Sequence, residues 1–266
     1  ESEMVKKLRI KQINSGVFTA VGLSEIEPGA SGLQMIPLKF RTWGELDYVR
    51  EKIRPMLEER LHAKGFEVLF WGDAGWVRFF SKEAATRPVE FQQMKMFTWA
   101  GDATQLSLME KMGYQPVPLE TSDILLGLNT NMITTVPLPP LLALAARING
   151  PAPHMLEMNW VPIVGACVVR TDVWEKIPPE LRAKLLASAE EIGTGMRTRG
   201  REEGDEAVRA MQQHGLQVHP MTPQSTREWQ AQVEKLYPAI RGSLVPAEIF
   251  DAVDHHLAEF RAKNQP

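Results

Sequence analysis

The feature that most constrains the fold is one long periodic segment. Residues 178–214 carry a helical pattern, with Pro178 and Pro179 where a helix can begin and Gly215 where it can end. At 1.5 Å per residue, such a helix is roughly 55 Å long, which exceeds the width of a small domain. We therefore expect it to run past two lobes. It contains four glycines that each cost about 1 kcal/mol relative to alanine: Gly193, Gly195, Gly200 and Gly204.

Strand-like and helix-like segments alternate along the rest of the chain. Short apolar runs predict strands at 17–22, 66–71, 76–81, 95–99, 115–119, 133–136, 160–170 and 216–220. Amphipathic segments predict helices at 1–12, 42–64, 102–112, 122–129, 140–148, 226–237 and 247–262. Thr42 and Glu45 form a capping-box pattern, and Gly65 suits a helix C-terminus. The alternation is typical of an α/β fold with mostly parallel sheets.

Composition and charge exclude several classes of protein. The chain has 266 residues, with 30 Lys and Arg against 33 Asp and Glu and a formal net charge of −3, so no basic surface for nucleic acid is indicated. Its longest apolar runs are about nine residues, whereas a bilayer span needs about 20. No basic start followed by an apolar stretch marks a signal peptide. Cys167 is the only cysteine, which excludes an internal disulfide and a zinc site built on several cysteines.

No arrangement of residues predicts an enzyme active site. The sequence lacks a nucleophile elbow, a phosphate-binding glycine loop and a dinucleotide fingerprint. The histidines show no metal-binding spacing: His255 and His256 are adjacent on a predicted helix and should point about 100° apart, and His154 is expected in a loop. Asp102 is predicted to cap a helix. We therefore expect no catalytic residue, no metal and no cofactor.

Aromatic side chains gather near the ends of the predicted strands. Trp71 and Trp76 flank a glycine turn around Asp73, and carboxylates at strand ends can face the ligand crevice of an open α/β sheet. The same aspartate can equally stabilise the turn. Trp229 is expected on a peripheral helix. The remaining aromatics can line an apolar cavity or fill a core, and both interpretations stay open: Phe79, Phe80, Phe97, Trp99 and Trp160.

Several short motifs, in their order and spacing, resemble one family. Residues 36–41 are similar to its Pro-Leu-Phe-Arg turn, residues 94–96 lie where it has a Gly-Leu-Lys-Ile strand, and residues 113–118 match its G-x-x-P-V-P segment. Residues 174–180 resemble the start of its long helix. The family is that of the periplasmic solute-binding subunits of TRAP transporters (tripartite ATP-independent periplasmic transporters), of the DctP type.

The resemblance implies a two-lobed, type II-like binding protein of the Venus-flytrap kind, which closes on one solute by a hinge motion and is not an enzyme. The first lobe is expected to comprise 1–92 and part of 193–266, and the second 93–192, with helix 178–214 linking both. Family members begin with a further strand, helix and strand that this sequence lacks. Without them, the sheet of the first lobe would lose its central strand.

The resemblance also implies partners and a location. The expected partners are a small-molecule ligand, the TRAP permease subunits in the membrane and, as in some members, a periplasmic tetratricopeptide-repeat protein. The expected location is the periplasm, although the sequence contains neither a signal sequence nor a lipoprotein anchor.

Two positions that carry basic residues in the family are apolar here. Phe97 stands where an arginine holds the ligand carboxylate as a bidentate pair. Val77 stands where some members have a second basic residue, and Arg78 is expected to point to the other face of the strand. The family's polar Asp-Gly-x-x-Asn-Pro turn falls on residues 134–139, which are largely apolar. Because a buried carboxylate without a partner costs several kcal/mol, these changes argue against a small dicarboxylate.

The sequence therefore predicts an apolar or mainly apolar ligand in an interlobe cleft: lipid-like, an isoprenoid, or an aromatic or long-chain acid. Each Å² of apolar ligand surface covered contributes about 25 cal/mol. The residues expected to bind it are Trp71, Asp73, Trp76, Phe97, Trp99, Leu138, Asn159 and Trp160. The alternative is a conventional small organic acid held by a relocated cation. Candidate cations are Lys39, Arg41, Arg78, Arg87 and Arg170.

Overall fold

The computed structural model describes residues 1–100 and 103–264 and divides into two compact units, each with its own sheet. Unit 1 comprises Glu1–Ala74, Val161–Gly200 and Ala239–Pro266, and unit 2 comprises Gly75–Trp160 and Arg201–Pro238. The expected lobe boundaries differ, because 75–92 lies in unit 2 and 161–192 in unit 1. Strand pairing explains the difference: 162–170 pairs into the sheet of unit 1, and 78–81 pairs into that of unit 2. The expected α/β class is confirmed.

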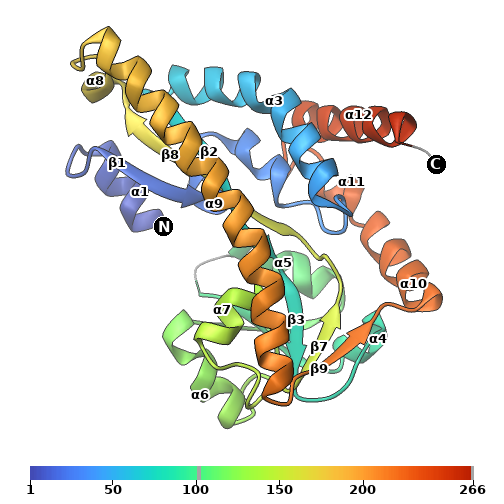
Figure 1. Ribbon diagram of the computed structural model, residues 1–266. Helices are drawn as coiled ribbons and strands as arrows, with labels where there is room; N and C mark the ends of the chain where they lie inside the picture. Colours follow the sequence, from blue (N-terminus) through green and yellow to red (C-terminus); the bar gives the residue numbers. More distant parts are fainter. Residues whose placement is uncertain (101–102, 265–266) are drawn as a thin grey trace. The chain divides into compact units, whose positions relative to one another are not determined.

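The long helix is present nearly as the sequence predicts it. Helix α9 (Pro179–Gln213) runs as one continuous helix in Figure 1, and Gly215 follows it with a φ of 93°. Its residues up to Gly200 belong to unit 1 and the rest to unit 2. Gly193 has a packing reason: a Cβ there would lie 2.8 Å from the Cβ of Phe70. Among the described residues, no helix is long and apolar enough to cross a bilayer.

The sheet of unit 1 has the strand order β1-β8-β2. Its strands are β1 (Ser15–Thr19), β8 (Pro162–Arg170) and β2 (Phe66–Trp76). The expected strand at 17–22 is too long, because Thr19 caps helix α2 (Ala20–Ile26) by accepting the N–H of Val21. The expected glycine turn around Asp73 is wrong, since β2 continues through it. Asp73 therefore belongs to an extended strand rather than to a turn.

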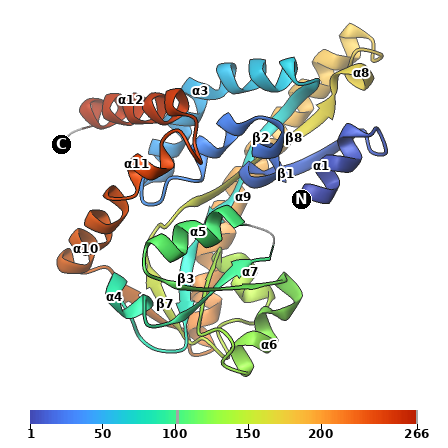
Figure 2. The same cartoon turned by 180° about the vertical axis from the view of Figure 1, so that it is seen from behind.

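Helices cover this sheet and close unit 1. They are α1 (Ser2–Arg9), α2, α3 (Trp43–Ala63), α8 (Thr171–Trp174) and α12 (Ala247–Lys263), with a 3₁₀ turn at Pro28–Leu33 and the short α11 (Tyr237–Ile240) ahead of α12. Figure 2 shows α12 beside α3, where Arg261 pairs with Glu45 at 2.7 Å. Thr42 caps α3 as expected by accepting the N–H of Glu45. The reciprocal bond differs, because Glu45 accepts the N–H of Arg41 instead.

The sheet of unit 2 has the strand order β5-β4-β6-β3-β7-β9. Its strands are β3 (Arg78–Ser81), β4 (Lys95–Trp99), β5 (Gln115–Leu119), β6 (Thr135–Leu138), β7 (His154–Glu157) and β9 (Gln217–Pro220). Strand β4 is parallel to β5 and β6, and β7 to β9, whereas β3 is antiparallel to both neighbours. The loop expected at His154 is wrong, because His154 begins β7.

Short helices complete unit 2. They are α4 (Pro88–Phe91), α5 (Ala103–Lys111), α6 (Ile124–Asn129), α7 (Pro140–Ala145) and α10 (Pro223–Glu234), with a 3₁₀ turn at Thr121–Asp123. The predicted cap at Asp102 lies outside the described residues.

Two adjacent residues of β3 enter two different cores. Phe80 packs in a core with Phe97, Val136, Met155 and their neighbours on one face of the sheet. Phe79 points to the other face, because side chains alternate along a strand. There it meets an aromatic cluster in which ring centroids lie 5.3 to 5.7 Å apart: Phe79, Phe91, Trp160 and Trp229.

Trp229 is a central part of that cluster rather than a peripheral residue. Its side chain has no exposed area, and its indole N–H donates to the carbonyl of Thr86 at 2.9 Å. The expectation of a peripheral position is therefore wrong. The sequence did not predict this buried position, because most residues of α10 are polar and Trp229 is its only buried aromatic residue.

We expect Gly193→Ala to destabilise unit 1 by about 1–3 kcal/mol, because the new methyl group would overlap Phe70. The matched control is Gly195→Ala on the same helix, where the nearest atom is a flexible Arg199 nitrogen at 3.9 Å. That change should stabilise by up to about 1 kcal/mol through helix propensity. Urea unfolding followed by circular dichroism measures both. Equal effects of the two variants would contradict the close approach of α9 to β2.

We expect Trp229→Ala to destabilise unit 2 by about 3–5 kcal/mol, because it empties a fully buried site and leaves the Thr86 carbonyl without its donor. Trp229→Phe should cost less, since most of the ring volume remains. Thermal unfolding of both variants measures the difference. A melting temperature unchanged by the alanine substitution would contradict the central position of Trp229.

Candidate functional site

Four neighbouring strands of unit 2 end in one row of side chains. Strands β3 and β6 pair Arg78 with Leu138. Strand β4 is parallel to β6, and continuing their register places Trp99 beside Leu138. Strand β7 flanks β3 on the other side, and its register continues to Glu157 beside Arg78. We call Trp99, Leu138, Arg78 and Glu157 the unit 2 row.

The unit 2 row lies on one face of the sheet, at the ends of its strands. Leu138 belongs to the core that contains Phe80, and Trp99 packs against that core. Arg78 shares this face because it is two residues from Phe80. Trp99 and Leu138 are the last residues of the parallel strands β4 and β6. The carboxyl ends of parallel strands are where open α/β sheets bind their ligands.

Arg78 is the unusual member of the row. Its Nε is buried and has no hydrogen-bond partner among the described residues. Burial is the main influence on its guanidinium and lowers its pKa, while the carboxylates of Glu157 and Asp205 act in the opposite direction. Neither carboxylate forms an ion pair with it in the described part of the chain. A partly desolvated guanidinium with an unused donor favours an anion, because charge-assisted hydrogen bonds are the strong ones.

The other candidate cations already have partners. Carboxylates neutralise three of them: Lys39 with Asp254, Arg87 with Glu228, and Arg170 with Asp172. The last two are bidentate, with N···O distances of 2.5 to 2.9 Å. Arg41 also has a partner. Arg78 is therefore the cation in this group best placed to accept an external anion.

The positions of the two missing basic residues are buried. Phe97 is 1% exposed in the core of unit 2, with its ring centroid 5.1 Å from that of Trp99. Val77 is 4% exposed. Phe97 therefore packs against Trp99 inside the core and is not a member of the unit 2 row.

Within unit 2, the expected site residues lie in different surroundings. Trp160 lies in the aromatic cluster, on the face of the sheet opposite Phe97. Trp76 is buried and Asn159 half-buried in unit 2, and neither belongs to the row. Only Trp99 and Leu138 of the expected set lie in the row, with Phe97 packed beneath them.

Trp71 and Asp73 lie in a buried network of unit 1. The Trp71 indole N–H donates to Glu58 at 3.0 Å, and its carbonyl accepts from Arg197 at 2.6 Å. Asp73 lies 3.9 Å from a guanidinium nitrogen of Arg50, which is itself 3% exposed. These contacts join α3, β2 and α9, so both expected ligand residues have structural contacts in this state.

Glu157 and Arg50 are residues that sequence reasoning did not consider. Glu157 becomes a candidate site residue only because the register of β3 and β7 places it beside Arg78. Arg50 has a buried Nη1 without a hydrogen-bond partner among the described residues. Neither lies in a recognisable motif, so no sequence signal could have selected them.

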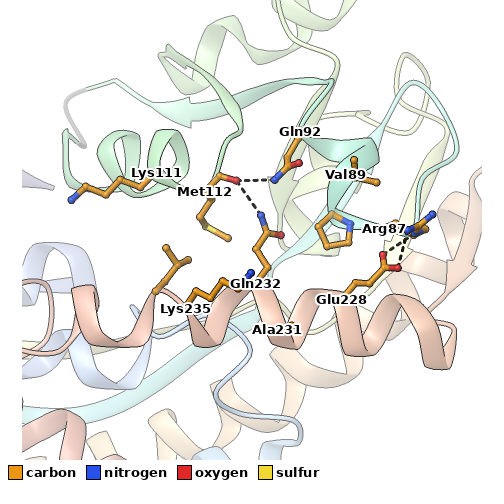
Figure 3. Close-up of a pocket in the computed structure, with 11 residues that line it drawn as sticks. Arg87, Val89, Gln92, Lys111, Met112, Glu228, Ala231, Gln232 and Lys235 are labelled. Carbon is orange, nitrogen blue, oxygen red and sulfur yellow. Dashed lines mark hydrogen bonds and ion pairs between the residues drawn. The ribbon is translucent and has the colours of Figure 1, made fainter.

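Unit 2 also has a surface cavity of about 490 Å³ between α4, the end of α5 and α10 (Figure 3). Gln92 and Gln232 both donate to the carbonyl of Met112, at 2.9 and 3.0 Å. The ion pair of Arg87 and Glu228 forms one side of it. The cavity contains none of the expected ligand residues, and Arg87, Glu228, Gln92 and Gln232 already have partners there.

The histidine pair on α12 is closer than its sequence positions suggested. Potential ligand atoms of His255, His256 and Glu259 lie within 4.8 Å of one another. The Glu259 carboxylate is already engaged by Lys263 at 2.7 Å, which is the main reason that its pKa falls to about 2. We assign no ligand to this partly exposed group.

The two-unit α/β fold matches that of solute-binding proteins. The structure is similar to that of a TRAP periplasmic solute-binding protein from Ochrobactrum anthropi, with a TM-score of 0.88 and 18% identity over 99% of this chain and 82% of that one. A protein from Ralstonia eutropha H16 with bound (S)-2-acetolactate matches with a TM-score of 0.86, at 17% identity over 97% of this chain and 83% of that one. One from Chromohalobacter salexigens with bound D-glucuronate gives 0.84 at 15% identity, over 96% and 84%.

Residues 1–242 match the family model of bacterial extracellular solute-binding protein, family 7 (DctP), and the chain belongs to this family. It is 22% identical to the C4-dicarboxylate-binding periplasmic protein DctP of Rhodobacter capsulatus over 262 residues, which cover 96% of this chain and 77% of that protein. These proteins bind solutes and are not enzymes. The family implies a small-molecule ligand and a membrane permease as partners.

We expect the stability of unit 2 to fall as the pH drops through about 6.5. His154 and His219 meet across β7 and β9, with 2.9 Å between their ring nitrogens. Burial, and then the charge of His219, lower the pKa of His154 from 6.5, so the unfolded chain takes up the proton first. Thermal unfolding between pH 5 and 7.5 should show a smaller pH dependence for His154→Gln than for the wild type. The same slope in His154→Gln, or an equal change in the exposed control His214→Gln, would contradict this assignment.

Proposed function

We propose that this protein is the periplasmic receptor of a TRAP transporter for monocarboxylic acids with an apolar body, such as aromatic or long-chain acids. The observation that carries the proposal is the unit 2 row, in which one unpaired guanidinium stands between an apolar pair and a carboxylate. Arg78 would hold the ligand carboxylate. Leu138 and Trp99 would contact the body of the ligand.

The charge of the row favours a single carboxylate. Glu157 stands on one side of Arg78, so a second ligand carboxylate on that side would meet a like charge. Because Glu157 is exposed, solvent screens part of this repulsion, but it still disfavours a second negative charge there. On the other side the second carboxylate would meet Leu138, which offers no hydrogen bond, and Trp99, whose indole N–H is a single uncharged donor. A small dicarboxylate is therefore a poor fit.

The apolar side of the row favours a ligand with a hydrocarbon or aromatic part. Covering apolar surface contributes about 25 cal/mol per Å², and the indole of Trp99 is partly buried against the core beneath it. A neutral lipid or an isoprenoid would use this surface but leave Arg78 without a partner. Among the expected apolar ligands, the acids therefore fit best. The tetratricopeptide-repeat partner rests on the family resemblance alone.

A small polar acid is the second candidate, and one observation favours it. The similar structures contain the small acids (S)-2-acetolactate and D-glucuronate. Each has one carboxylate that the same arginine could hold. This alternative differs from the first in the body of the ligand rather than in its charge.

Mass spectrometry of an organic extract of the purified protein is the first experiment, with an unrelated periplasmic protein as control. Titration calorimetry then compares phenylacetate, octanoate, D-glucuronate and succinate. We expect phenylacetate or octanoate to bind more tightly than succinate by at least about tenfold, or 1.4 kcal/mol. Preferred binding of D-glucuronate would favour the second candidate. Preferred binding of succinate would overturn both.

We expect Arg78→Gln to weaken monocarboxylate binding by about 10- to 100-fold, the range for loss of a charge-assisted hydrogen bond. Arg87→Gln is the matched control, because Arg87 lies in the same unit and is paired with Glu228; it should leave binding unchanged. Glu157→Gln should improve succinate binding by removing the like charge. Equal affinities of the Arg78→Gln and Arg87→Gln variants would contradict the assigned role of Arg78.

A further inference from the structure

Two exposed carboxylates lie near the Arg78 guanidinium in unit 2. Glu157 is next to Arg78 in the unit 2 row, because the register of β3 and β7 continues to this pair. Asp205 comes from α9, three residues before Val208, which packs against the core that contains Phe80. Both carboxylates act on the charge of Arg78, yet within the described ranges neither forms an ion pair or a side-chain hydrogen bond. One cation and two anions are therefore free to contact a ligand.

The charges of this group do not balance when a simple acid binds. In the free protein, Arg78 compensates part of the negative charge of Glu157 and Asp205. A carboxylic acid bound to Arg78 would neutralise the guanidinium with its own charge. Both side-chain carboxylates would then lie near an anion without a cation to offset them, and such like-charge neighbours are unfavourable. A ligand with a positive group beside its carboxylate would remove this cost.

The order of the unit 2 row matches the substituents of one carbon atom. Glu157 lies on one side of Arg78, and Leu138 and then Trp99 lie on the other. An α-amino acid carries its carboxylate, its ammonium group and its side chain on the same carbon. When the carboxylate binds Arg78, the other two groups can point in opposite directions along the row. The ammonium group would then meet Glu157, and the side chain would cover Leu138.

The position of Trp99 sets the size of that side chain. Trp99 lies two strands from Arg78, or about 10 Å at the usual strand spacing. A small side chain would end over Leu138, whereas an aromatic ring can reach the indole and form a ring contact with it. From these charges and this distance we infer that the ligand is a zwitterionic α-amino acid with a large aromatic side chain. The inference rests on the proposed function, because it uses the same carboxylate site at Arg78.

Titration calorimetry with three acids of similar size tests the ammonium group. L-Phenylalanine, L-3-phenyllactate and 3-phenylpropanoate share the ring and the carboxylate, and they carry an ammonium group, a hydroxyl group or a hydrogen atom on the α-carbon. We expect L-phenylalanine to bind at least about tenfold more tightly than the other two. If 3-phenylpropanoate binds and L-phenylalanine binds no more tightly, this inference is wrong while the proposed function stands. Binding of none of the three acids would overturn both.

Two substitutions that remove a charge identify the groups that bind the ammonium group. Glu157→Gln and Asp205→Asn should each weaken L-phenylalanine binding by about tenfold, while 3-phenylpropanoate binding stays unchanged or improves. A merely structural role would weaken the binding of both ligands.

The matched control for these variants is Glu203→Gln. Glu203 is exposed on the same helix, and at 100° per residue it points about 200° away from Asp205 around the helix axis. The control should leave both affinities unchanged. Equal effects of Glu157→Gln on the two ligands, or no loss of L-phenylalanine affinity in that variant, would overturn the inference.

Discussion

The arrangement of unit 2 depends on the alternation of side chains along β3. Phe79 and Phe80 are adjacent in sequence, and each is fully buried in a different core. A slip of one residue in the pairing of β3 would turn both rings to the wrong face, so the register is strongly fixed. The same register determines where Arg78 lies. The position of Arg78 at the end of β3 is thus fixed by the packing of Phe79 and Phe80 into two cores rather than by hydrogen bonds of its own.

The helices were the predictable part of this fold, because their signals are local. Helix α9 differs from the expected segment 178–214 by one residue at each end, since the prolines and Gly215 mark its limits. Strand β2 was not predictable in the same way. Its glycines around Asp73 suggested a turn, yet β2 continues through them, with Gly75 at a φ of 103° inside the strand, so the turn propensity is overridden. Strand β7 has only four residues and follows a proline, so its sequence is hard to distinguish from that of a loop.

The candidate site was less predictable than the fold, because it depends on strand register. The sequence indicated an excess of aromatic residues, and most of these fill cores: Phe97 on one face of the sheet and Trp160 on the other. The unit 2 row joins residues from four strands that are far apart in the chain. Arg78 stands one position from the expected basic residue and, as expected, points to the other face of the strand, which it shares with Phe80. Only the pairing of β3 with β6 shows that Arg78 lies beside Leu138.

The register also links the charge of the proposed ligand to its shape. The family resemblance places the ligand arginine at Phe97 on β4, whereas the unpaired guanidinium is on β3, two strands and about 10 Å away. A ligand whose carboxylate binds Arg78 on β3 would place its remaining atoms at the end of β4. That end now carries Trp99, with Phe97 packed beneath it. A cation on β3 instead of β4 therefore means one polar contact fewer at the end of β4 and an apolar surface beside Arg78. A ligand that keeps its carboxylate and exchanges polar groups for apolar ones satisfies both changes together.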